Sequence, residues 1–176
     1  MANFWNRLFK KQQQETIVTE TTATPITSEV VSPLTGRVMA LKDIADPVFS
    51  QELMGKGIAI EPTEGKVVSP INGTVVMLFD THHAIGLKSN DGVEVLIHVG
   101  MDTVELKGKG FTPHIKTGDQ VSVGDLLVEF DIDFIKEAGY QTVTPIVVTN
   151  TADYASIEAI TTEDVKGGDH LLSISK

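Results

Sequence analysis

Short apolar runs separated by turn-forming residues dominate the chain from Glu29 onward. Val, Ile and Leu gather in stretches such as GKGIAIEP, GVEVLIHVG, DLLVEFD and TPIVVTN, and Gly, Pro, Asn and Asp stand between them. β-Branched residues favour strands, and these turn residues end them. Such a series of short strands is typical of β-sandwiches and barrels. The sequence therefore predicts an all-β fold, an antiparallel β-sandwich or barrel-sandwich, with helical turns only in DPVFSQELMG and DFIKEAGY.

An internal repeat divides this pattern in two. The stretch VVSPLTGRVMAL (30–41) matches VVSPINGTVVML (67–78) nearly position for position. A fainter echo links VSVGDLLVEF (121–130) with VKGGDHLLSI (165–174). Two copies are too few for a solenoid. We therefore expect a duplicated β-motif whose two copies pack face to face.

The N-terminal part of the chain differs from this pattern. Residues 1–11, MANFWNRLFKK, place aromatic and leucine side chains at helical spacing among Arg and Lys, which is typical of a short amphipathic helix on an anionic membrane surface. The alternative is a frayed terminus, because so short a helix is marginal in water. Residues 12–28 are rich in Thr and Gln and predict a flexible linker. The β-sandwich domain is then expected at residues 29–176.

Composition narrows the classes of partner. The formal net charge is −10 at pH 7, so the chain is poorly suited to nucleic acid and better suited to a basic protein. It has no cysteine, which excludes disulfides and a thiolate nucleophile and fits a reducing compartment. We find neither an apolar run long enough to span a bilayer nor a signal peptide. We expect a cytoplasmic protein, with membrane contact through the N-terminus left open.

Two histidines are the candidate chemical groups. In GVEVLIHVG, one face of a strand is lined by valine and isoleucine and the other carries His98, while FDTHHAIGLK carries a histidine pair. The segment KSNDGV between them predicts a hairpin. A four-residue SNDG turn places His83 opposite His98, whereas a two-residue DG turn places it opposite Gly100 and diagonal to His98. In both registers the two imidazoles share a face with Thr81, with Cβ atoms roughly 4.5–5.5 Å apart when directly opposite.

Two neighbouring imidazoles can hold a metal ion or move protons. Alternatively, one can act as a nucleophile while the other stabilises the anion that it receives. A metal site needs further ligands, for which His114, Asp102 and Asp46 are candidates without a recognised ligand spacing. We therefore expect no dedicated metal site, although adventitious or partner-shared zinc at His83 and His98 stays open. The remaining alternative is a histidine pair without chemistry.

The segment GVEVLIHVGMDTVELKGKGF (92–111) resembles the phosphorylation-site signature of the glucose-type enzyme IIA domain of the bacterial sugar phosphotransferase system. The resemblance continues, in the same order, through SPLTGRVMALKDIADPVFSQELMGKGIAIEP, SPINGTVVMLFDTHHAIGLKS, GDQVSVGDLLVEFD and TPIVVTN. It covers about residues 28 to 175. The fold of that family is an antiparallel β-sandwich, which agrees with the strand pattern.

The resemblance implies a phosphotransferase function. His98 would accept a phosphoryl group on Nε2 from the phosphohistidine of the carrier protein HPr. It would pass the group to a cysteine of an enzyme IIB domain, which phosphorylates sugar during import by the membrane IIC domain. His83 would be the second active-site histidine, oriented by a hydrogen bond with Thr81. The resemblance requires no cofactor. In some bacteria, members of the family also regulate other proteins by binding them in the unphosphorylated form, and the sequence leaves this role open for the present chain.

The resemblance also implies a surface for binding partner proteins. Two carboxylates match rim residues with which the family meets an arginine of HPr, and apolar side chains form a collar that excludes water and docks the partner. These expected residues are Asp46 and Asp102 at the rim, with Phe49, Phe79, Val48 and Leu96 in the collar. One departure is His82, which stands where the family often has asparagine.

Two other classes of protein share part of the pattern. The rhythm of IKTGDQVSVGDLLVEFD is similar to that of biotinyl and lipoyl carrier domains, but those need a lysine in an MKM or DKA setting, and neither tripeptide occurs. A zinc endopeptidase of similar fold would need several His and Asp ligands on separated strands. A regulatory binding module stays open beside the phosphoryl carrier.

Overall fold

The computed structural model describes residues 27–176. The predicted N-terminal helix (1–11) and nearly all of the predicted linker (12–28) lie outside the described residues. The first strand begins at Thr27, slightly before the domain start expected at Glu29.

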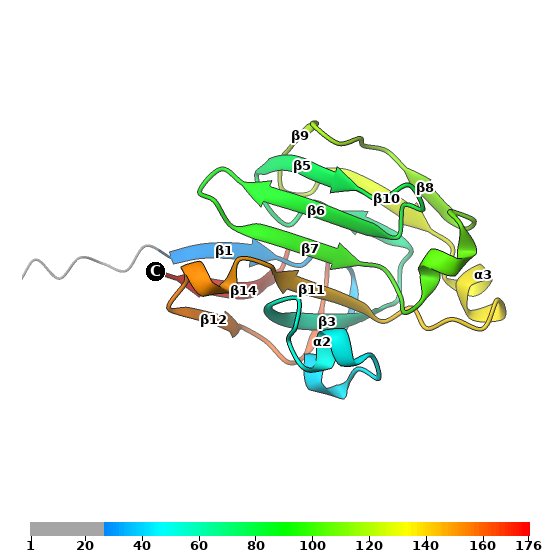
Figure 1. Ribbon diagram of the computed structural model, residues 1–176, viewed down its shortest axis with the longest axis horizontal. Coiled ribbons are helices and arrows are strands. Elements are labelled where there is room, and N and C mark those ends of the chain that lie inside the picture. The colour runs from blue at the N-terminus through cyan, green and yellow to red at the C-terminus, as the bar shows by residue number, and fades with distance from the viewer. Residues whose placement is uncertain (1–26) are drawn as a thin grey trace, which may run out of the picture.

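The described chain forms one large antiparallel sheet and two small ones. The large sheet has eight strands in the order β13-β2-β3-β11-β7-β6-β5-β9, and Figure 1 looks onto it. In that order its strands are β13 (Asp164–Val165), β2 (Gly36–Met39), β3 (Lys56–Pro62), β11 (Thr144–Val148), β7 (Glu94–His98), β6 (Ala84–Ser89), β5 (Gly73–Leu78) and β9 (Gln120–Val121).

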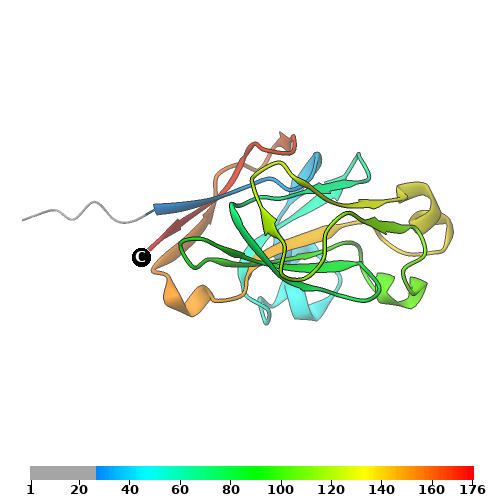
Figure 2. The ribbon, with the colours of Figure 1, turned by 90° about the horizontal axis from the view of Figure 1, so that it is seen from above.

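The two small sheets have three strands each. One has the order β1-β14-β12, with β1 (Thr27–Val31), β14 (His170–Ser175) and β12 (Ser156–Ala159). It brings the two ends of the described chain side by side, as Figure 2 shows. The other has the order β4-β10-β8, with β4 (Lys66–Val68), β10 (Leu126–Phe130) and β8 (Phe111–Pro113).

Helical structure is limited to single turns or little more. The α-helices of the described residues are α2 (Pro47–Ser50) and α3 (Ile132–Glu137), both in the stretches where helical turns were predicted. Three 3-10 turns accompany them: η1 (Leu41–Asp43), η2 (Thr103–Leu106) and η3 (Thr151–Asp153). The predicted all-β antiparallel fold with short helical turns is confirmed.

The repeat is a structural duplication. Its two copies hydrogen-bond to each other reciprocally, because the Val31 N–H donates to the Pro70 carbonyl at 3.1 Å and the Val68 N–H donates to the Pro33 carbonyl at 2.9 Å. The first copy forms β2 and the second β5, and these strands occupy matching places on either side of the centre of the large sheet. Each pairs with a short outer strand, β13 or β9, from the fainter echo.

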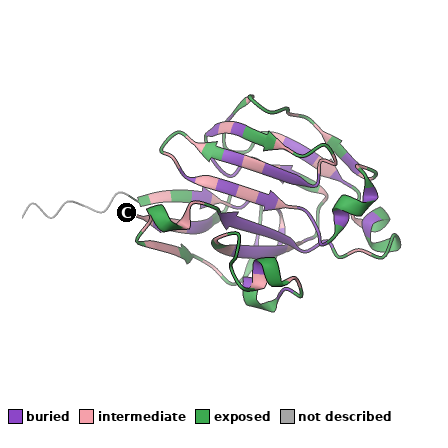
Figure 3. Cartoon of the chain, viewed as in Figure 1, coloured by how far each residue is buried: buried purple, intermediate pink, exposed green. Residues whose placement is uncertain are grey.

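The two halves of the large sheet differ in what covers their outer face. The inner face packs on the main core, whereas on the outer face of β3 and β11 a second cluster forms beneath η1 and α2. This cluster contains Leu41, Ile44, Phe49, Ala59, Met101, Val143 and Val147. All of β11 is therefore buried, whereas β7 alternates between buried and half-buried residues (Figure 3). The half-buried residues of β7 are Glu94, Leu96 and His98, so this half of the outer face is available for a site.

Candidate functional site

His98 is the last residue of β7, on the outer face of the large sheet. Its neighbour Ile97 is fully buried in the main core, and alternation along the strand turns His98 the other way. Directly across the ladder stands Ala84, whose small side chain leaves room for the ring.

One hydrogen bond sets the tautomer of His98. Its Nδ1 lies 2.9 Å from the Gly100 carbonyl oxygen. A carbonyl oxygen can only accept, so Nδ1 carries the proton and donates. In a neutral imidazole this leaves the lone pair on Nε2, which is the nucleophilic nitrogen.

His83 stands edge-on to His98. The ring centroids are 4.8 Å apart with an interplanar angle of 84°. His83 is buried, at 4% exposure, and its Nδ1 is 2.6 Å from the Thr81 hydroxyl oxygen. The prediction that these two imidazoles meet, with Thr81 beside them, is confirmed by this geometry.

The predicted hairpin register, however, was wrong by one residue. The ladder pairs Ala84 with His98 and Lys88 with Glu94, which fits neither the two-residue nor the four-residue turn. The Ser89 N–H donates to the Val93 carbonyl at 2.8 Å, closing a three-residue loop whose last residue, Gly92, has a φ of 99°. Three-residue hairpin loops need such a left-handed position, and glycine fills it.

In this register His83 lies just beyond the regular strand, where the chain bends. Its carbonyl still accepts from the Val99 N–H at 2.7 Å, so its backbone stays at the edge of the ladder. The two rings therefore meet because the chain bends before β6, not because the residues are opposite in a regular hairpin.

Both imidazoles favour the neutral form. Burial, and then the charge that His98 carries when protonated, lower the pKa of His83 from 6.5 to about 4. Burial also lowers the pKa of His98, while its hydrogen bond to Gly100 and the carboxylates of Asp46 and Asp102 oppose that shift. At neutral pH the site thus favours two uncharged imidazoles side by side.

Aromatic rings flank the pair on both sides. Phe49 lies 5.1 Å from the His98 ring and Phe79 lies 5.6 Å from the His83 ring, measured between centroids. Phe49 is buried in the second cluster and Leu96 packs against it, whereas Phe79 and Val48 are 41% and 42% exposed. The predicted collar thus has one buried member, Phe49, one half-buried member, Leu96, and two exposed members.

Three further exposed apolar residues were not predicted as part of the site. A bulge in β5 leaves Val76 and Met77 both exposed, next to Gly86 on the outer face. Val104, in η2, is 45% exposed. A bulge breaks the alternation of a strand, so the sequence pattern gave no signal for Val76 and Met77.

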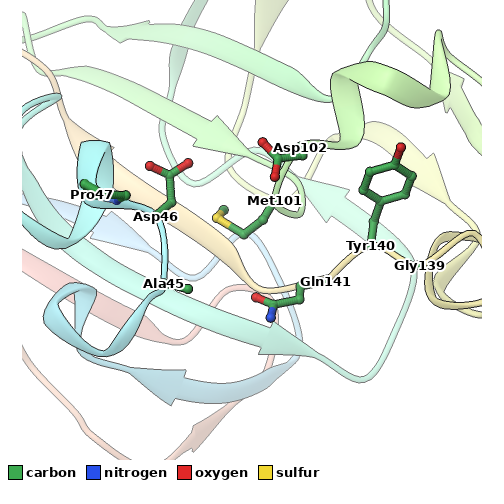
Figure 4. A pocket seen from close by; sticks show the side chains of 8 residues that line it. All are labelled: Ala45, Asp46, Pro47, Met101, Asp102, Gly139, Tyr140 and Gln141. Carbon is green, nitrogen blue, oxygen red and sulfur yellow. The ribbon is translucent and has the colours of Figure 1, made fainter.

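The two predicted rim carboxylates lie around one cavity of about 440 Å³. Figure 4 shows Asp46, just before α2, and Asp102, after β7, with the side chain of Met101 between them. Asp46 Oδ1 accepts from the Val48 N–H at 2.8 Å, so this residue also caps α2. Neither carboxylate has an ion-pair partner within the described residues.

The structure gives no support for a metal site at the pair. Within residues 27–176, no group of three or more His, Cys, Asp or Glu side chains is arranged to hold a metal ion. The candidate ligand His114, which directly follows β8, is instead paired with Glu129 of β10, 2.8 Å away.

No helix among the described residues has the length and apolar character that crossing a membrane requires.

Fold and site together define a class of protein: an all-β domain that holds a neutral histidine, half-exposed, beside a buried one within an apolar collar. Residues 28–154 match the model of a protein family described as "phosphoenolpyruvate-dependent sugar phosphotransferase system, EIIA 1". The chain belongs to this family, which supports a phosphocarrier role in sugar uptake and, more generally, a transferase role.

Similar proteins agree with this assignment. The chain is 46% identical over 147 residues to the glucose-specific EIIA component of Halalkalibacterium halodurans, covering 84% of this chain and 85% of that protein. It is 56% identical over 129 residues, or 73% of its length, to the beta-glucoside-specific EIIBCA component of Dickeya chrysanthemi. The chain spans only 20% of that longer protein.

A solved structure, glucose permease IIA from Mycoplasma capricolum, superimposes with a TM-score of 0.80 at 32% identity. The match covers 84% of this chain and 96% of that one. The sandwich described above is therefore the fold of this family.

Proposed function

We propose that the chain carries phosphoryl groups from phospho-HPr to a IIB domain, with His98 Nε2 as the acceptor. A bond forms between Nε2 and phosphorus as the bond from phosphorus to the donor histidine of HPr breaks. The group then leaves Nε2 for a cysteine thiolate of IIB. The observation that carries this proposal is the hydrogen bond from His98 Nδ1 to the Gly100 carbonyl, since it leaves Nε2 free to attack.

The same hydrogen bond serves the intermediate. Phosphorylation at Nε2 places positive charge on the ring, and a proton on Nδ1 that already faces a carbonyl oxygen stabilises that charge. The rings of Phe49 and Phe79 limit access of water to the bond from Nε2 to phosphorus. Imidazole suits both transfers because it is at once a good nucleophile and a good leaving group near neutral pH.

His83 supports the transferred group in this proposal. When the Thr81 hydroxyl donates to His83 Nδ1, the proton of the neutral ring resides on Nε2. That N–H can donate to a phosphoryl oxygen on His98, whose ring is 4.8 Å away between centroids. Such a bond positions the group and stabilises its charge during transfer.

The rim and collar recognise partner proteins in this proposal. An arginine of HPr would neutralise the unpaired carboxylates Asp46 and Asp102, while the exposed Phe79 and Val48 contact apolar surface. Once the phosphoryl group is on His98, those carboxylates repel it, and this favours release of the carrier. The EIIBCA relatives, whose names join EIIA with EIIB and EIIC, support IIB and IIC as the next partners, on the cytoplasmic side.

Incubation with phosphoenolpyruvate, enzyme I and HPr tests the proposal. We expect an acid-labile phosphate on the chain, absent from His98→Ala. His83→Gln should still accept phosphate but pass it on poorly to glucose- or beta-glucoside-type IIB domains. Phosphate retained by His98→Ala would contradict the proposal, and normal onward transfer by His83→Gln would remove the division of roles.

The other predicted classes predict different results in the same assay. A biotinyl or lipoyl carrier and a zinc endopeptidase would both remain unphosphorylated. A regulatory binding role of the unphosphorylated form would add to the relay, since the exposed collar can dock more than one protein.

A further inference from the structure

His82 has an uncommon backbone conformation directly before an active-site residue. Its φ is 59°, in the left-handed region, and it is one of only a few non-glycine residues with a positive φ in the described chain. Asn, Asp and His tolerate this region better than other residues with side chains, and β-branched residues tolerate it least.

This conformation is built into the connection between β5 and β6. The His82 N–H donates to the Phe79 carbonyl at 2.7 Å, and the Phe79 N–H donates to the Ala84 carbonyl at 3.1 Å. The turn is therefore closed on both sides of His82. The bend that directs the chain into β6 follows immediately.

The bend decides where His83 points. Ala84 is opposite His98 and shares its outer face, so a straight extension of β6 would turn the His83 side chain toward the inner face. The His83 ring is instead on the outer side, between the rings of Phe79 and His98.

Nδ1 of the His82 ring is buried and has no hydrogen-bond partner among the described residues. The ring therefore does not hold this turn together through Nδ1. Nδ1 faces Gly108, where an added Cβ would lie 3.8 Å away.

We infer that His82 is a positioning residue that acts through its left-handed backbone, not through its ring, to aim His83 at His98. This inference rests on the proposed function of the two histidines. It predicts that residues which adopt the left-handed conformation can replace His82, whatever their side-chain chemistry.

A series of four substitutions separates the effect of the His82 backbone from the effect of its ring. All four remove the imidazole, but they differ in how readily they adopt a positive φ. His82→Gly and His82→Asn should stay within about threefold of the unmodified rate of onward transfer to IIB, since both residues adopt positive φ readily. His82→Val should slow onward transfer by about tenfold or more while still accepting phosphate from HPr. His82→Ala should fall between them, and it keeps the test informative if His82→Val does not fold.

A second readout does not depend on phosphotransfer. The ¹⁵N shifts of the His83 ring report its hydrogen bond with Thr81, and we expect them to change in His82→Val but not in His82→Asn. Glu52 also has a left-handed conformation, with a φ of 56°, and lies in the loop after α2. Glu52→Val is therefore a matched control that imposes similar strain and should leave the His83 shifts unaltered.

The outcomes are distinguishable. Equal losses in all four variants would overturn the inference in favour of a role for the imidazole, and normal transfer by His82→Val would overturn it altogether. If the unmodified chain accepts no phosphate, the proposed function fails instead, and the ¹⁵N shifts still decide whether the backbone of His82 positions His83.

Discussion

The carbonyl that accepts the hydrogen bond from His98 Nδ1 belongs to Gly100, a position without room for a side chain. Gly100 has a φ of 75°, and an added Cβ would lie 2.5 Å from Thr103 Cγ2 and 2.6 Å from the Gln141 carbonyl oxygen. Thr103 is itself fixed, because its hydroxyl donates to the Val99 carbonyl. The tautomer of His98 thus depends on close packing around a glycine.

Gly100→Ala should accordingly harm both stability and phosphate acceptance. We expect about 1–3 kcal/mol of lost unfolding free energy, from strain and overpacking. Acceptance from HPr should slow by about tenfold or more, as a fixed tautomer is lost. Gly118→Ala is a matched control, because Gly118 also has a positive φ but nothing lies near its added Cβ. A normal acceptance rate in Gly100→Ala would show that this carbonyl does not set the tautomer.

Protonation of His83 should couple stability to pH. Its pKa is about 4 in the folded chain and 6.5 as the ordinary value, so between these the unfolded chain binds more protons. Stability is then fully present above pH 6.5 and declines as the pH falls toward 4, by at most about 1.4 kcal/mol per pH unit from this residue. Chemical denaturation between pH 6.5 and 5 should show a shallower decline for His83→Gln. Identical slopes would mean that His83 is not kept neutral by burial.

The rim carboxylates should influence the pKa of His98. Asp102 raises the pKa of His98 against the effect of burial, so Asp102→Asn should lower that pKa further. An NMR titration of the His98 ring protons measures the shift directly. A pKa that rises or stays constant would place Asp102 too far from His98 to matter.

Among the elements, α2 brings a structural role and a proposed functional role together at Asp46. Asp46 caps this helix through Oδ1 and also faces the cavity at the rim. Asp46→Ala should cost about 1 kcal/mol of unfolding free energy, whereas Asp46→Asn keeps the capping oxygen and most of that stability. Both should slow transfer from HPr, because both remove the charge. Equal destabilisation by the two substitutions would argue against the cap, and full-rate transfer in Asp46→Asn would argue against a role for the charge.

The β6–β7 hairpin shows what pattern can and cannot predict about an element. The valine face of β7 and the turn residues predicted both strands and their contact. The register was wrong because KSNDGV is compatible with several loop lengths, and only the left-handed Gly92 selects the three-residue loop. The bend at His83, which keeps the rings together, depends on tertiary hydrogen bonds that periodicity does not reveal.

For the whole molecule, the duplication was predictable because both copies kept the same residues at the same spacing. The features that make the two copies differ were not predictable from the repeat. Leu41, the last residue of the first copy, and residues 42–54 after it supply η1 and α2, which cover one half of the outer face. The other half carries the histidines. The short strands β8, β9, β12 and β13 were also missed, since two to four residues are too few for a periodic signal.

The charge of the whole chain should act on its encounter with HPr. A formal net charge of −10 attracts a basic partner over long range, and salt screens that attraction. Raising NaCl from about 0.05 to about 0.5 M should slow the bimolecular transfer on the order of tenfold. Stopped-flow transfer from phospho-HPr measures this, and a salt-independent rate would show that charge does not steer the encounter.

Identifying the nitrogen that carries the phosphate tests the proposed function most directly. NMR of the ¹⁵N-labelled chain after phosphorylation by HPr should show a ³¹P coupling at Nε2 of His98, with Nδ1 still protonated. Coupling at Nδ1 of His98, or on either ring of the pair His82 and His83, would contradict the assignment of His98 Nε2 as the acceptor.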